Sequence, residues 1–135
     1  MEDKLSHAQR AFLEAKHFAS LATVNRDGSP QQSAMWYLLE GDEIMFNTRV
    51  GRQKERNLRR DPRVSVLVTQ AYTYVRLEGR ARRIDDPDIG HADIRRLAIR
   101  YHGEEKGERQ FQDMYATQER VTFRVAIERV RSMGI

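Results

Sequence analysis

Three strand-like segments follow one another near the start of the chain, and the loops between them are only as long as hairpin loops. The segments span residues 19–25, 31–39 and 44–48, and they are joined by residues 26–30, which include Asp-Gly, and by residues 40–43. Parallel strands need a crossover connection of about a dozen residues or more. These loops are too short for one, so the segments are predicted to form an antiparallel β-meander.

The remainder of the chain adds strands and short helices. The further strands are predicted at residues 64–69, at 73–84 and from residue 121 onwards. The helices are predicted at residues 6–17 with Ser6 and Gln9 as a capping box, at 51–60, from Asp86-Pro87, and near 109–116 after a polar loop at 102–108. We therefore expect a mainly β protein, a small six-stranded antiparallel barrel with short helices, in a single domain spanning residues 1–135.

The composition excludes several kinds of site. The 135 residues contain no cysteine, which rules out disulfides, thiolate nucleophiles and iron–sulfur clusters. The four histidines lack the spacing that places two metal ligands on one helical face, so we expect surface histidines and no metal site. Neither a Gly-x-Ser-x-Gly nucleophile elbow nor a glycine-rich phosphate-binding fingerprint occurs.

No segment of the sequence indicates a membrane protein. The apolar runs are far shorter than the roughly 20 residues of a membrane span. The charged start of the chain, MEDKLSHAQR, lacks the apolar stretch of a signal peptide. We expect a cytoplasmic protein without a membrane partner.

The positive charge is concentrated in one segment. Residues 49–63 hold seven cations and two acids, a net charge of 7 − 2 = +5, whereas the whole chain has 24 − 20 = +4. Arg52 and Lys54 stand at the start of the helix predicted here, where free backbone N–H groups also lie. Cations and free N–H groups together are typical of a phosphate-binding site. A solvated basic helix explains the same charges equally well.

A second unusual segment, Ser-Ala-Met-Trp-Tyr at residues 33–37, holds the only tryptophan of the chain. Its flat apolar side chains are suited to contact a planar ring. Packing in the core is the alternative, and it is the more common role of Met and aromatic residues on a strand.

Taken in order, these segments carry a resemblance to a known family. The matching elements are a helix followed by FASLATVNRDGSPQQSAMWYLLEGDEIMFNT, then the later strands VSVLV, EGRARRI and VTFRVAIERV. Between them, the basic segment contributes Lys54, Asn57, Leu58, Asp61 and Pro62. The chain resembles the pyridoxamine 5′-phosphate oxidase-like family of flavin- and deazaflavin-binding split β-barrels over nearly its whole length. The resemblance implies the FMN-binding type of split β-barrel.

Within that family the chain is most similar to the branch that binds coenzyme F-420, an 8-hydroxy-5-deazaflavin. The resemblance implies a homodimer with cofactor sites at the interface. It places the phosphate end of the cofactor on Arg52 and Lys54, with Asn57 in support. The residues implied to flank the ring are Gln31, Ser33, Ala34, Met35 and Trp36, and those implied near the ribityl chain are Asn47 and Thr48.

The activity implied by the resemblance is that of an oxidoreductase in which reduced F-420 gives a hydride to an unsaturated small organic substrate. Pyridoxamine phosphate oxidases proper extend beyond the last strand, so vitamin B6 oxidation is not expected of a chain that ends at Ile135. The basic segment favours F-420 over FMN, because F-420 carries an anionic oligoglutamate tail as well as a phosphate.

No catalytic residue is predicted, and Tyr37, Tyr72 and Tyr74 are candidate proton donors. Three alternatives to the F-420 reductase stay open. They are an FMN-binding protein of the same family, a carrier of F-420, flavin or haem without turnover, and a nucleic-acid-binding barrel that uses the basic segment.

Overall fold

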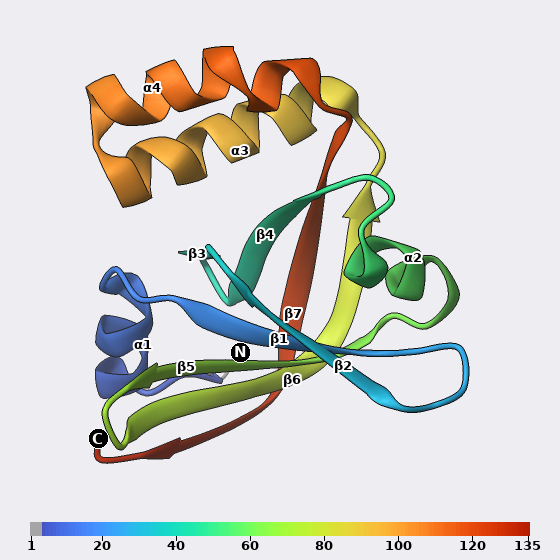
Figure 1. Ribbon diagram of the computed structural model, residues 1–135. Helices are drawn as coiled ribbons and strands as arrows, with labels where there is room; N and C mark the ends of the chain where they lie inside the picture. The colour runs from blue at the N-terminus through green and yellow to red at the C-terminus, as the bar shows by residue number, and fades with distance from the viewer. Residues whose placement is uncertain (1–3) are drawn as a thin grey trace.

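The structure is a computed structural model that describes residues 4–135, so the first three residues of the charged N-terminal segment lie outside it. Seven strands form one antiparallel sheet in the order β2-β1-β5-β6-β7-β4-β3 (Figure 1). The strands are β1 (Ala19–Val24), β2 (Pro30–Met35), β3 (Leu38–Glu40), β4 (Glu43–Arg49), β5 (Arg63–Gln70), β6 (Thr73–Ile84) and β7 (Arg120–Met133). The helices are α1 (His7–Glu14), α2 (Gln53–Arg60), α3 (Pro87–His102), α4 (Glu104–Asp113) and the 3-10 turn η1 (Tyr115–Thr117).

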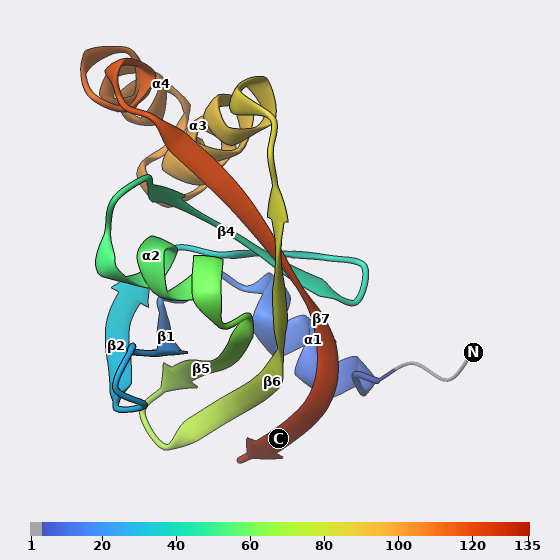
Figure 2. The ribbon, with the colours of Figure 1, turned by 90° about the vertical axis from the view of Figure 1, so that its right-hand side faces the viewer.

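The two edge strands of this sheet, β2 and β3, are neighbours along the chain. Only Trp36 and Tyr37 lie between the end of β2 at Met35 and the start of β3 at Leu38. Each residue spans at most about 3.6 Å, so this connection brings the two edges together. The sheet therefore curls into a half-closed barrel (Figures 1 and 2), and the predicted fold class is confirmed.

The predicted number of six strands is wrong, because the strand expected at residues 31–39 is divided into β2 and β3. Up to Met35 the chain pairs with β1, and from Leu38 it pairs with β4. Tyr37 at the break is fully buried, and its hydroxyl donates a hydrogen bond to the carbonyl oxygen of Leu13 at 2.8 Å. The apolar pattern runs on across the break, so it does not reveal the change of partner.

The alternation predicted for residues 73–84 is confirmed in β6. Val75, Leu77, Gly79 and Ala81 are buried in the core, and the charged residues between them face outward. The register between β6 and β7 shifts at Gly79, where an added Cβ would lie 2.3 Å from the Ala126 carbonyl oxygen. Only glycine fits this close approach. Figure 2 shows β6 and β7 running together from the helices to the opposite end of the molecule.

Two predicted helix starts are confirmed. In α1 the Ser6 and Gln9 side chains each accept a hydrogen bond from the other residue's backbone N–H. At α3 the Asp86 side chain accepts from the first-turn N–H groups and Pro87 is the first helical residue. Within residues 4–135, no helix has both the length and the apolar composition needed to cross a membrane.

The loop predicted at residues 102–108 is wrong, because α3 and α4 form a helical hairpin there. Gly103 alone separates the two helices, with a φ of 89° that favours glycine. Gly107 of α4 packs against the backbone of Ala98, and an added Cβ would lie 2.6 Å from it. The tight hairpin covers one end of the curled sheet (Figure 1).

Candidate functional site

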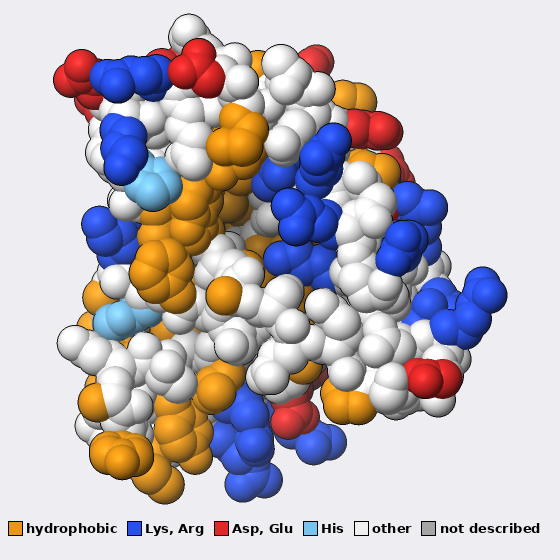
Figure 3. Space-filling view, in the orientation of Figure 1, with side chains coloured by type: hydrophobic (Ala, Val, Ile, Leu, Met, Phe, Trp, Pro, Cys, Tyr) orange, Lys and Arg blue, Asp and Glu red, His pale blue; other side chains and the backbone are white. Residues whose placement is uncertain are grey.

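A cavity of about 560 Å³ opens where β2, the end of β4, the start of α2 and the helical hairpin meet. Figure 3 shows a hollow between a column of hydrophobic side chains and a cluster of Lys and Arg side chains. The volume is in the range of small-molecule sites. Nine of the ten residues predicted to contact a cofactor line this cavity: Gln31, Ser33, Ala34, Met35, Trp36, Asn47, Thr48, Arg52 and Lys54.

The aromatic wall of the cavity is built around Trp36, at the break between β2 and β3. Its ring stacks on Tyr101 of α3, with ring centroids 5.2 Å apart and planes inclined by 9°. Tyr115 meets it edge-on at 6.3 Å. The indole packs against the second apolar cluster of the protein and also lines the cavity. Core packing of Trp36 is therefore confirmed, and the same side chain stays a candidate surface for a bound ring.

Ser33 on β2 supplies a polar group without a partner. Its Oγ is buried and forms no hydrogen bond within the described part of the chain. A buried hydroxyl that lacks a partner destabilises the fold. Because Ser33 lines the cavity, a bound molecule with a polar ring atom would satisfy this hydroxyl.

The opposite end of the cavity is lined by four cationic side chains, which we call the cationic cluster: Arg49, Arg52, Lys54 and Arg120. Within residues 4–135, none of the four forms an ion pair with a carboxylate. The first turn of α2 starts here, and its N-cap Arg52 forms no side-chain cap. Cations without counter-ions beside free helix N–H groups make an anion-binding site.

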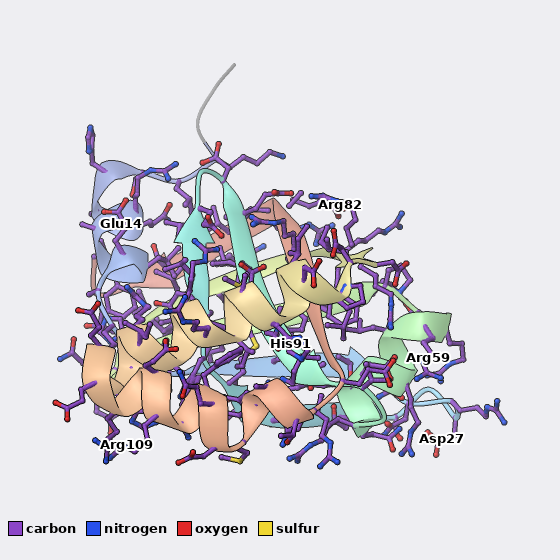
Figure 4. All side chains as sticks on the ribbon, turned by 90° about the horizontal axis from the view of Figure 1, so that it is seen from above. Glu14, Asp27, Arg59, Arg82, His91 and Arg109 are labelled. Carbon is purple, nitrogen blue, oxygen red and sulfur yellow. The ribbon has the colours of Figure 1, made fainter. Side chains whose placement is uncertain are left out.

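The structure divides the seven cations of residues 49–63 into two groups. Three of them, Arg49, Arg52 and Lys54, line the cavity. The other four do not line the cavity and bond to protein groups: Arg56 to Gln53, Arg59 to Glu55, Arg60 to the carbonyl oxygen of Val24, and Arg63 to Asp61. Figure 4 labels Arg59 on α2. Only the first group is placed where the predicted phosphate site could form, and the second group forms the solvated part of the segment.

Burial and mutual repulsion lower the pKa values of two members of the cationic cluster. Burial, together with the nearby charges of Arg120 and Arg52, lowers the pKa of Lys54 to about 8. Burial, together with the charges of Arg52 and Arg49, lowers the pKa of Arg120 to about 10, so this guanidinium stays charged at neutral pH. A bound anion would therefore offset the repulsion between these cations and stabilise their charged forms.

We expect Lys54→Met to stabilise the protein near neutral pH by about 1–2 kcal/mol, because it removes a half-buried charge that has no counter-ion. The folded-state pKa of about 8 lies below the ordinary 10.5, so the charged lysine lowers the stability fully below about pH 8. As the pH rises from about 8 to 10.5 that penalty disappears, and the advantage of the variant should shrink.

Urea unfolding of both proteins at several pH values measures this difference. The exposed Lys106→Met is the matched control and should show no such pH dependence. A Lys54→Met variant whose stability gain is the same at every pH would contradict the assignment of the penalty to this charge.

Sequence reasoning missed Arg120, because its place in the site depends on strand pairing. It faces Arg49 across the β4–β7 ladder, from a position distant in the sequence. Its Nε donates to Asn47 Oδ1 at 3.0 Å, and its Nη1 donates to Gln118 Oε1 at 2.9 Å. The guanidinium also lies over the ring of Tyr115, 4.9 Å from the centroid.

A buried chain of hydrogen bonds continues behind Arg120. Asn47 Nδ2 donates to Thr122 Oγ1 at 3.1 Å, and Thr122 Oγ1 donates to Asp93 Oδ2 at 2.8 Å. Asn47 Nδ2 also donates to the carbonyl oxygen of Gly90 at 2.8 Å. Asn47 therefore lines the cavity as predicted and, in addition, fixes the Arg120 side chain to the β4–β7–α3 junction.

Asn57, the tenth predicted residue, does not line the cavity. It is fully buried behind the start of α2, where its Nδ2 donates to Thr23 Oγ1 at 3.0 Å and to Asn25 Oδ1 at 2.9 Å. Its Oδ1 accepts from Gln53 Nε2 at 2.9 Å. It therefore holds the start of α2 against β1, and unlike the other nine predicted residues it does not reach the cavity.

Glu55 anchors the same helix from its buried side. The carboxylate is fully buried, accepts hydrogen bonds from Arg59, and accepts further bonds from the Gly51 N–H at 2.8 Å and Arg83 at 2.9 Å. Burial by itself would raise the pKa of Glu55, but these hydrogen bonds outweigh it and lower the pKa to about 2. The carboxylate is therefore engaged by these donors, and no ion pair between it and Lys54 forms in the described residues.

None of the three tyrosines named as candidate proton donors lines the cavity. Tyr37 is buried in the core, Tyr72 is 92 % exposed at the β5–β6 turn, and Tyr74 lies on β6. The tyrosine at the cavity is Tyr115 of η1, whose pKa burial raises above its ordinary value. Its position in the folded chain comes from the helical hairpin, which the sequence pattern did not reveal.

Two of the histidines, His7 and His102, are exposed as expected, and the other two are partly exposed. His17 is half-buried and stacks on Phe12. His91, labelled on α3 in Figure 4, is half-buried with its Nε2 2.8 Å from the carbonyl oxygen of Gln118 at the cavity wall. In residues 4–135, no group of three or more His, Asp or Glu side chains is placed to hold a metal ion.

The architecture and the cavity can be compared with known proteins. The family model described as pyridoxamine 5′-phosphate oxidase matches residues 5–134. The chain belongs to the pyridoxamine 5′-phosphate oxidase family. The resemblance found in the sequence is thereby confirmed, and the split-barrel fold is that of this flavin-type oxidoreductase family.

Solved structures agree with this membership of the pyridoxamine 5′-phosphate oxidase family. A conserved hypothetical protein from Mycobacterium tuberculosis is 34% identical, with a TM-score of 0.79 over 95% of this chain and 84% of that chain. An F-420 reductase is 26% identical, with a TM-score of 0.76 over 94% of this chain and 98% of the other. General stress protein 26 from Bacillus anthracis, at 16% identity and a TM-score of 0.68, shares the fold over 92% of this chain and 89% of its own.

Proposed function

We propose that this member of the family is a reductase that uses coenzyme F-420 and passes a hydride to an unsaturated small organic substrate. The observation that carries the proposal is the cationic cluster, without carboxylate partners in residues 4–135, at one end of a cavity with an aromatic wall at the other. A molecule with an anionic end and a flat ring matches both ends. The similarity to an F-420 reductase over nearly the full length of both chains supports the choice of cofactor.

The residues present fit such a cofactor. Its phosphate would lie at the cationic cluster and the N-terminus of α2, and its ring would lie on the side of Trp36 and Met35. The unpartnered hydroxyl of Ser33 would hydrogen-bond to a polar ring atom. A cluster with this much uncompensated charge favours F-420 over FMN, because the oligoglutamate tail of F-420 adds anionic groups to its phosphate.

A bound deazaflavin supplies the hydride-transfer chemistry, and the chain supplies binding, orientation and protection from water. Trp36, fixed by its stacking on Tyr101, orients the ring side of the site. Tyr115 keeps its proton at neutral pH, since burial raises its pKa, and it lies on the cavity wall where it can hold that proton toward a substrate.

The proposal includes a homodimer in the cytoplasm with the cofactor site at the interface between the two copies. Phe18 is 66 % exposed and Met114 is 42 % exposed, and both line the cavity. Large apolar side chains exposed at the rim of a site are suited to be covered by a second subunit. This supports a cavity that is completed in the dimer.

Tryptophan fluorescence tests the cofactor directly, because Trp36 is the only tryptophan in the chain and lies on the cavity wall. We expect F-420 to quench this fluorescence saturably, with a dissociation constant at least about tenfold lower than that of FMN, since it carries more charge for the cluster to bind. Turnover is then tested by mixing the protein with reduced F-420 and a panel of unsaturated compounds.

Each other outcome of this experiment points to a definite alternative. Tighter binding of FMN would assign the protein to the FMN-binding members of the family. Tight F-420 binding without any turnover would indicate a carrier. If neither cofactor quenches saturably while DNA or RNA binds with a steep salt dependence, the basic segment serves a nucleic acid instead.

A further inference from the structure

Lys54 differs from the other lysines of this chain. There are four lysines in all, and Lys4, Lys16 and Lys106 are exposed at the surface. Lys54 is half-buried in the wall of the cavity, in the first turn of α2. One amine of the four is therefore placed where a bound small molecule would contact it.

The groups around this amine are cationic or uncharged. Arg52 precedes it at the N-cap of α2, Arg120 comes from β7, and Arg49 comes from the end of β4. Tyr115 contributes a protonated phenol, and the α3 side chains at the cavity are apolar. The adjacent carboxylate of Glu55 is occupied by Arg59, Arg83 and the Gly51 N–H, as described above.

Within the described residues, the Lys54 amine therefore has neither an ion-pair partner nor a hydrogen-bond partner. An amine without an acceptor is free to act as a nucleophile once it loses its proton. Arg120 stays charged at neutral pH, and the guanidinium groups of the cationic cluster provide donors for an anion. One end of the cavity thus combines anion binding with a free primary amine.

We infer that Lys54 is a covalent capture site for small anionic aldehydes. The arginines of the cationic cluster bind the anionic group, and the neutral Nζ attacks the aldehyde carbon. The carbonyl oxygen takes up protons and leaves as water, so the aldehyde and the amine give an imine plus one water. The step needs neither an oxidant nor a reductant, and it does not depend on which cofactor the protein uses.

The lowered pKa of Lys54 supports its role as the nucleophile, beside arginines that bind the anionic group. With a pKa of about 8, about a tenth of Lys54 is neutral at pH 7, whereas a lysine at the ordinary value of 10.5 is almost entirely protonated. A cofactor phosphate bound at the same cluster would block the site. Capture therefore belongs to the protein before its cofactor binds.

The probe for the experiment is pyridoxal 5′-phosphate, an anionic aldehyde, with pyridoxal as its counterpart without the phosphate. The full chain is incubated near neutral pH, reduced with borohydride and mapped by peptide mass spectrometry, which separates Lys54 from the three exposed lysines and from the α-amino terminus. Inorganic phosphate serves as a competitor. The variants are Lys54→Arg, which keeps the charge but forms no imine, and Lys106→Arg as the matched control.

We expect pyridoxal 5′-phosphate to label Lys54 at least about tenfold faster than any of the exposed lysines, because more of its amine is neutral and the arginines concentrate the reagent. Inorganic phosphate should slow this labelling, pyridoxal should show a much smaller preference, and Lys54→Arg should abolish it while Lys106→Arg leaves it unchanged. Labelling in proportion to exposure would overturn the inference, and so would equal reaction with pyridoxal. If F-420 does not bind in the fluorescence titration but Lys54 is still labelled selectively, the proposed cofactor is contradicted and the capture site is not.

Discussion

Replacing Lys54 and Arg120 together by glutamine is expected to raise the dissociation constant for F-420 about a thousandfold. Each side chain offers a charge-assisted hydrogen bond from a half-buried position, worth about 1.5–3 kcal/mol. Two such bonds amount to about 4 kcal/mol, which corresponds to the thousandfold loss. The quenching of Trp36 fluorescence measures the change, because the ring is held by Tyr101, His102 and Tyr115, which both substitutions leave in place.

The matched control also removes two positive charges, but from the part of the basic segment that does not line the cavity. Arg56→Gln with Arg63→Gln changes the net charge equally, but these side chains contact Gln53 and Asp61 and do not line the cavity. This control should weaken binding less than about tenfold, since exposed charges contribute little. Equal losses in the two double variants would mean that binding follows net charge alone, and the cationic cluster would lose its assigned role.

Removing the carboxylate of Glu55 is expected to cost the fold about 3 kcal/mol. Glu55→Ala removes a fully buried carboxylate and takes away the acceptor that the Gly51 N–H and Arg83 share, while Arg83 keeps its second partner Asp85. The Arg59 side chain is half exposed, so water compensates for its share. Urea unfolding followed by circular dichroism gives the loss of unfolding free energy, and α2 with its cavity end should loosen first.

Glu105→Ala is the matched control for this substitution. Glu105 pairs with Arg109 at the same i, i+4 spacing as Glu55 with Arg59, but it lies on the exposed face of α4. Its removal should change the stability by no more than about 0.5 kcal/mol. Similar losses in the two variants would contradict the anchoring role of Glu55.

The pH dependence of the Glu55 contribution follows from its lowered pKa. The folded-state value of about 2 lies below the ordinary 4.5, so the stabilisation is fully present above about pH 4.5 and is lost as the pH falls through 2. The stability difference between the wild type and Glu55→Gln should therefore narrow over this range in acid.

Features that depend on neighbouring residues were predictable. Loop lengths determine that the first strands are antiparallel, and Ser6 with Gln9 and Asp86 with Pro87 determine two helix starts. The order of motifs was sufficient to indicate the family. Nine of the ten predicted site residues line the cavity. They come from two continuous segments, and residues that are neighbours in a segment lie close together in the fold.

Features that depend on contacts between distant parts of the chain could not be predicted from the sequence. The break at Trp36 and Tyr37 follows from a change of pairing partner, which leaves the apolar pattern intact. Arg120 and Tyr115 enter the cavity from beyond the helical hairpin, and their side chains carry no local signal of that position. The pairing of Asn57 with Thr23 and Asn25 likewise required the placement of α2 on β1.

The sequence by itself determined that this chain has an antiparallel β framework and one segment with a large excess of positive charge. The tertiary structure alone decided how that charge is used. It pairs Arg59 and Arg63 with acids beside them and leaves Arg49, Arg52 and Lys54 without such partners in the described residues. It also brings Arg120 to the same cavity, opposite Arg49 on the β4–β7 ladder. The physical reason is that a charge count adds residues along the chain, whereas ion pairing and desolvation depend on which residues the fold brings together.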